Sequence, residues 1–123
     1  MEQKKDNTPL LKYAAARQAA FSRGVEQMNG YETKTTFYAD MTIAEAWGLA
    51  GVKETYDRIN RDWRSNYEYY TEFVLVLNHK IWEHYESNEA LARLYNDLWQ
   101  EADAWASENF KGEAAEHYFR VTD

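Results

Sequence analysis

The chain of 123 residues contains no cysteine, one proline and five glycines, and it has no long hydrophobic run. Without cysteine, the sequence excludes disulfides, thiol nucleophiles and thiolate metal sites. The longest apolar run, residues 73–77, is far shorter than the roughly 20 residues that cross a bilayer. The N-terminus lacks the apolar stretch of a signal peptide. These absences predict a soluble, cytoplasmic protein.

Aromatic residues are abundant: 5 Trp, 10 Tyr and 5 Phe make up 16% of the chain, and hydrophobic residues make up 45%. A chain of this length and apolar content is typical of one folded domain. We therefore expect a disordered tail at 1–8 and a single helical domain at 9–123. Aromatic side chains stabilise cores and also favour interfaces, and composition does not separate these uses.

The hydrophobic periodicity predicts an all-α fold, a small bundle of four to five helices. A helix over 9–28 begins at Pro9, and a capping box at Thr42 and Glu45 opens a short helix that ends near Gly48. Further helices are expected from about residue 52, from a second capping box at 65–68 to about Glu86, and from Ser87 or Asn88 onward. The helix that ends near Glu86 is apolar around most of its circumference, which is typical of the centre of a bundle.

One segment interrupts the helical pattern. Residues 31–40 contain three threonines and three aromatics without a helical period, which is typical of extended structure. We predict an extended, β-like insert at about 29–42, laid over the helices as an arm, because no second strand of similar quality is available to pair with it.

The formal net charge of −7 is unevenly distributed. Residues 1–60 carry eight basic and eight acidic residues, whereas residues 61–123 carry six basic and thirteen acidic ones. Phosphate backbones are bound through cationic contacts, so direct nucleic-acid binding is not expected. Carboxylates spaced along a rigid helix can instead occupy a basic surface of a protein partner. The alternative interpretation is a solvated face that keeps the domain soluble.

The candidate partner-binding residues lie on the predicted last long helix. Its carboxylates would face a cationic partner, and two aromatic side chains would form an exposed edge beside them. The set comprises Glu89, Asp97, Glu101, Asp103, Glu108, Trp99 and Tyr95.

Catalytic and metal motifs are absent, so the sequence predicts a non-enzymatic protein without cofactors. His79 is followed by Glu83 at helical spacing, which predicts a solvated ion pair on an outward-facing stripe. His84 is predicted to be a core or boundary residue. No Glu-x-x-His unit, zinc-protease motif or phosphate-binding loop occurs, and no metal site is expected.

A second hypothesis concerns residues 42–64, which resemble the outline of a helix-turn-helix with Gly48 and Gly51 in the turn. Its second helix would present Lys53 and Arg58 beside Glu54 and Asp57, a charge-neutral mixture. The corresponding function is a DNA-binding accessory factor. A third hypothesis is a structural or self-assembling phage protein that uses an aromatic surface.

Several stretches over about 35–123 resemble a group of small uncharacterised proteins carried by phages and conjugative elements of gut bacteria. These stretches are 36–40, 43–44, 55–56, Trp63, 71–72, 77–82, 111–113 and 120–123. The resemblance implies a mobile genetic element inside a bacterial host cell, but no catalytic residue. In that setting, an acidic binding protein is expected to inhibit a host nucleic-acid-targeting defence, such as a CRISPR nuclease or restriction enzyme.

Overall fold

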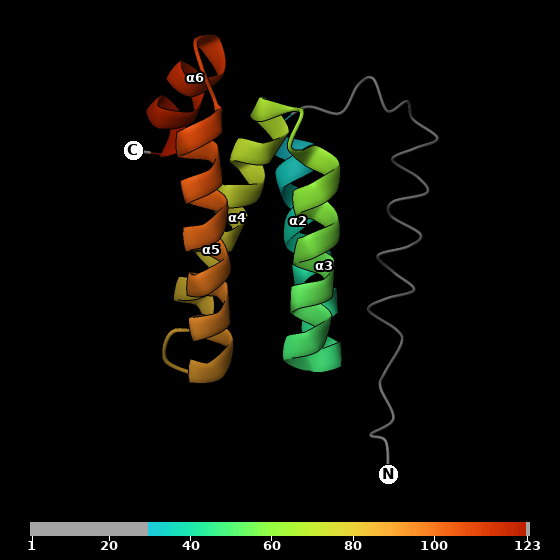
Figure 1. Cartoon of the computed structure of the whole chain (residues 1–123). Helices are drawn as coiled ribbons and strands as arrows, with labels where there is room; N and C mark the ends of the chain where they lie inside the picture. Colours follow the sequence, from blue (N-terminus) through green and yellow to red (C-terminus); the bar gives the residue numbers. More distant parts are fainter. Residues whose placement is uncertain (1–29, 123) are drawn as a thin grey trace, which may run out of the picture.

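The computed structural model describes residues 30–122 as an all-α bundle, which confirms the predicted fold class (Figure 1). The predicted tail at 1–8 and helix at 9–28 lie outside these residues. The helices are α2 (Gly30–Ala44), α3 (Gly48–Trp63), α4 (Tyr67–His84), α5 (Glu89–Asn109) and α6 (Glu113–Thr122), with a 3₁₀ turn, η2 (Glu45–Trp47), after α2.

The α4 helix is the centre of the bundle, as its apolar circumference predicted. It packs against α5, α2, α6 and α3, and α5 runs alongside it in Figure 1. Phe73 of α4 meets Phe37 of α2 at 5.6 Å and Tyr56 of α3 at 5.6 Å between ring centroids. The abundant aromatic residues therefore serve the core first, and this one ring joins three helices.

The predicted extended insert at 29–42 is wrong within the described residues, because residues 30–44 form α2. Phe37, Met41 and Ala44 are buried, and their spacing of four and three residues places them on one helical face. Packing of that face against α4 outweighs the modest β preference of the threonines. Thr42 consequently lies inside α2 and does not open a new helix.

The turn between α2 and α3 also differs from the helix-turn-helix outline. Residues 42–47 are divided between the last turn of α2 and η2, so the short first helix of that motif is not formed. Gly48 has φ 80°, which favours glycine, and it begins α3. The second helix of the outline is present as α3, and the DNA-binding hypothesis stays a prediction.

The predicted breaks on either side of α4 are confirmed, but the capping box expected from Ser65 is wrong, because Asn66 caps α4 as Asn88 caps α5. Asn66 Oδ1 accepts a hydrogen bond from the Tyr69 backbone N–H at 3.1 Å, and Asn88 Oδ1 accepts one from Leu91 N–H at 3.1 Å. Each cap satisfies a backbone donor that has no partner within its helix. These two caps fix where α4 and α5 begin.

Candidate functional site

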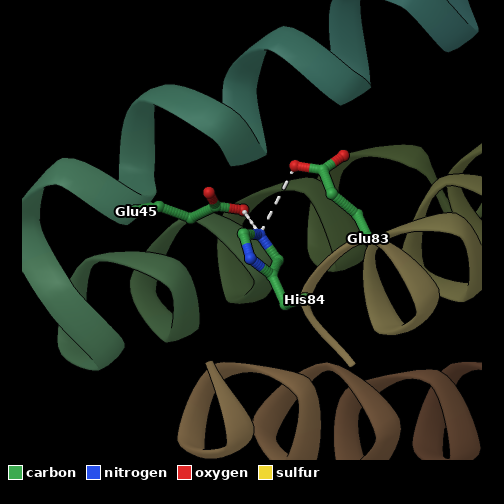
Figure 2. A group of neighbouring side chains, drawn as sticks. All are labelled: Glu45, Glu83 and His84. Atoms are coloured by element: carbon green, nitrogen blue, oxygen red, sulfur yellow. Dashed lines mark hydrogen bonds and ion pairs between the residues drawn. The ribbon is translucent and has the colours of Figure 1, made fainter. Parts of the chain in front are cut away.

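Two features of residues 30–122 gather candidate functional side chains, and the first is a polar cluster next to η2. Glu45 comes from η2, whereas Glu83 and His84 come from the last turn of α4 (Figure 2). His84 Nε2 lies 3.1 Å from Glu45 Oε2 and 3.5 Å from Glu83 Oε2. Three ligand atoms of these residues lie within 4.8 Å of one another, a spacing and donor chemistry that would suit a divalent cation.

Lys80 supplies a positive charge at the same place. Its side chain is fully buried, and Nζ lies 3.0 Å from Glu45 Oε2 and 3.0 Å from Glu83 Oε2. Nζ also donates to Thr42 Oγ1 at 2.8 Å. A metal held by Glu45, Glu83 and His84 would meet this ammonium group at close range, so binding requires Lys80 to move away. The polar cluster is therefore an ion-pair network that joins α4 to α2 and η2.

Two tyrosines complete the network. The Tyr95 hydroxyl of α5 donates to Glu45 Oε2 at 2.6 Å, and the Tyr38 hydroxyl of α2 donates to Glu83 Oε1 at 2.5 Å. Burial, followed by the hydrogen bond to Glu45, raises the pKa of Tyr95 well above its ordinary value. Both phenols therefore stay protonated donors at neutral pH, and the polar cluster links α2, η2, α4 and α5.

The protonation of Glu83 connects this cluster to stability. Partial burial alone would raise the pKa of Glu83, but hydrogen bonds from Tyr38 and Lys80 and the charge of Lys80 lower it below its ordinary value. A carboxyl with a depressed folded-state pKa stabilises the fold above its unfolded pKa, and this stabilisation is lost as the pH falls through the folded value. Glu72 has the opposite shift, because burial raises its pKa despite Lys34 and His117.

We therefore expect the free energy of unfolding to decrease when the pH drops below about 4.5. Protonation of Glu83 is one cause of this decrease. In the Glu83→Gln variant this loss should be shallower, because the group that gains a proton is gone. Urea unfolding at a series of pH values measures the slope, and Glu86→Gln is the control, since Glu86 is an exposed neighbour. Equal slopes for both variants would contradict the role of Glu83.

Sequence reasoning found one pair in this region and missed the rest. His79 Nε2 lies 3.8 Å from Glu83 Oε1, as the helical spacing predicted, and His84 is a half-buried boundary residue. However, Glu83 does not simply face outward, because it bonds Lys80. Glu45 is no capping residue but an acceptor from α4 and α5. Only the tertiary fold brings Glu45 and Tyr95 together, from positions 50 apart in the chain.

The second feature is a groove along α4 and α5 with a volume of about 600 Å³. Trp82 and Tyr85, near the end of α4, are 64% and 61% exposed, and their ring centroids lie 5.3 Å apart. From α5, the groove is lined by Glu89, Asp97 and Trp99, three of the predicted partner-binding residues. We call this feature the α4–α5 groove.

The predicted acidic residues of α5 do not all share one environment. Asp97, Glu101 and Glu108 are exposed, and a rotation of 100° per residue places them within about 40° of one another around the helix. Glu89 instead pairs with Arg93 at 2.7 Å, and Asp103 accepts a hydrogen bond from the buried Tyr118 hydroxyl. The acidic face of α5 is therefore the set Asp97, Glu101 and Glu108.

The predicted aromatic edge needs a correction at one of its two positions. Trp99 is half-buried and lines the α4–α5 groove. Tyr95 is fully buried, because it packs in the core and its hydroxyl bonds Glu45. The exposed aromatic side chains of the groove are Trp82 and Tyr85. Their signal in the sequence was an aromatic pair at i and i+3, although the helical spacing of Tyr85 from the apolar residues of α4 predicted that Tyr85 belongs to the apolar stripe, and the structure leaves it exposed.

Comparisons with protein-family models, curated proteins and solved structures find no match for this chain. The resemblance to proteins of phages and conjugative elements therefore stays a prediction. Within residues 30–122, no helix combines the length and apolar content that a bilayer crossing needs.

Proposed function

We propose that the protein is a non-catalytic binding protein that docks its acidic α5 face and the neighbouring α4–α5 groove onto a basic surface of a protein partner. The observation that carries the proposal is the adjacency of the two features. Asp97 belongs to the acidic face and also lines the groove beside exposed Trp82. Exposed aromatic residues next to unpaired charge are typical of interfaces.

The charge of the acidic face favours a protein partner over a nucleic acid. Within the described residues, no ion pair neutralises Asp97 or Glu108. Carboxylates repel a phosphate backbone but attract the basic channel that binds one, and such complementarity speeds association. Glu101 lies close enough to α3 to add to the raised pKa of Tyr56, which burial chiefly causes. The acidic face thus extends toward the α3 side of α5.

The sharper form of this proposal is an inhibitor of a host nucleic-acid-targeting defence. The acidic face would occupy the basic channel of a CRISPR nuclease or restriction enzyme in the bacterial cytoplasm. The resemblance to proteins of mobile genetic elements motivates this setting, and the charge of α5 supports the mode of action.

A competition assay tests the proposal. Purified restriction enzymes and CRISPR nucleases are bound to labelled duplex DNA, and the protein is added. We expect the wild-type protein to displace DNA from at least one enzyme. The triple variant Asp97→Lys, Glu101→Lys and Glu108→Lys should lose at least about 100-fold in apparent affinity, because three attractive contacts become repulsive.

The matched control reverses three exposed carboxylates of α3, with Glu54→Lys, Asp57→Lys and Asp62→Lys, which changes the net charge equally. This variant should displace DNA nearly as well as the wild type. Circular dichroism should give the same helicity for all three proteins. If both triple variants lose affinity equally, net charge explains the effect and the α5 face is not the docking surface.

A further inference from the structure

We infer that the α4–α5 groove receives an arginine side chain of the partner protein, with its guanidinium against the rings of Trp82 and Tyr85 and its charge facing Asp97. This inference rests on the proposed function and names the chemistry that the groove recognises. In this inference, the groove makes the specific contact with the partner. The rest of the acidic face attracts the partner over a longer range.

The aromatic side of the groove has room for a planar cation. Trp82 and Tyr85 expose most of their surface, and their rings are inclined by 45° with centroids 5.3 Å apart. They form a shallow aromatic wall, because neither ring is covered by another helix of the described chain. Cations stack on such rings, and tryptophan gives the strongest attraction.

The charge within the groove is also suited to one incoming cation. Arg93 lines the groove, but its guanidinium bonds Glu89 at 2.7 Å. Asp97 lies one helical turn further along α5, with no ion-pair partner among the described residues. The incoming charge therefore has one unpaired carboxylate open to it.

Arginine fits this place better than lysine. A guanidinium can stack flat on a ring while its N–H groups bond a carboxylate at its edge, which an ammonium group cannot do. An arginine of this protein already lies over a tryptophan ring. The guanidinium carbon of Arg64, at the end of α3, is 4.5 Å from the ring centroid of Trp105 on α5. The specificity for arginine would come from the two rings, whereas attraction of any cation comes from the carboxylates.

Two labelled peptides test the inference, one with four arginines alternating with glycines and one with lysines in the same positions. Fluorescence anisotropy measures binding to the whole chain at low salt. We expect the arginine peptide to bind about fivefold more tightly than the lysine peptide. Trp82→Ala should remove this preference by weakening the arginine peptide more than the lysine peptide. Trp47→Ala is the control, because Trp47 is 43% exposed on η2 and lies outside the groove.

Equal binding of the two peptides by the wild type, binding of neither, or the same effect from both tryptophan variants would overturn the inference. The proposed function is judged separately in the DNA competition assay. If Trp82→Ala displaces DNA as well as the wild type while the α5 triple variant does not, the acidic face is the docking surface and the α4–α5 groove does not bind arginine. If the α5 triple variant also displaces DNA, the proposed function itself fails.

Discussion

Replacing Lys80 with methionine is expected to lower the free energy of unfolding by about 3 kcal/mol. Methionine retains most of the aliphatic volume, so no large cavity forms. It removes the ammonium group that lies 3.0 Å from both Glu45 and Glu83 and 4.3 Å from the ring centroid of Tyr38. Two partly buried carboxylates would then repel each other without a cation between them.

The compensating variant separates charge from packing. Lys80→Met combined with Glu45→Gln and Glu83→Gln replaces the ion pairs with neutral groups of similar shape, a change that is often nearly neutral in buried networks. Chemical unfolding of the wild type, the single variant and the triple variant measures the three stabilities. We expect the triple variant to recover most of the loss. A single variant as stable as the wild type would show that Lys80 does not hold the cluster together.

Gly51→Ala is expected to destabilise the protein by about 2 kcal/mol, although alanine is the better helix former. A Cβ at Gly51 would lie 2.6 Å from the Ala44 carbonyl oxygen and 2.8 Å from Trp47 Cβ. Overpacking of this kind costs about 3 kcal/mol, against about 1 kcal/mol gained in helix propensity. The α2–α3 turn would have to open, and Glu45 would move with it.

The control for this variant is Ala50→Gly, at the exposed neighbouring position, which should cost only about 1 kcal/mol from propensity. Thermal unfolding followed by circular dichroism compares the two. Because propensity and packing predict opposite signs at Gly51, a Gly51→Ala variant more stable than the wild type would mean that α2 and α3 do not approach as closely as described.

The helices that sequence reasoning placed well have their apolar residues at regular helical spacing. Val52, Tyr56 and Ile59 on α3 are all buried, as are Leu91 and Leu98 on α5. In these helices the local pattern and the tertiary packing agree, so periodicity alone was sufficient. The asparagine at the start of α5 was also recognisable, because its side chain acts on a backbone group only three residues away.

The α2 helix was missed because its signals conflict. The threonines favour extended structure, whereas Phe37, Met41 and Ala44 have helical spacing, and the packing that decides between them involves Phe73 of a distant segment. The same distance explains the candidate sites. No local sequence pattern predicts that Glu45 contacts Lys80 or that Tyr95 is buried in the core. The acidic face of α5 was predictable because helical geometry alone aligns Asp97, Glu101 and Glu108.

The central claim is that the acidic α5 face and the α4–α5 groove form the docking surface, and amide hydrogen exchange tests it most directly. Exchange is measured for the protein alone and in complex with an enzyme that it displaces from DNA. We predict slower exchange on binding at 78–101, which spans the groove and the start of the acidic face, with no change in α3 at 53–62. Protection confined to α3, or unchanged exchange at 78–101 in a saturated complex, would contradict the account.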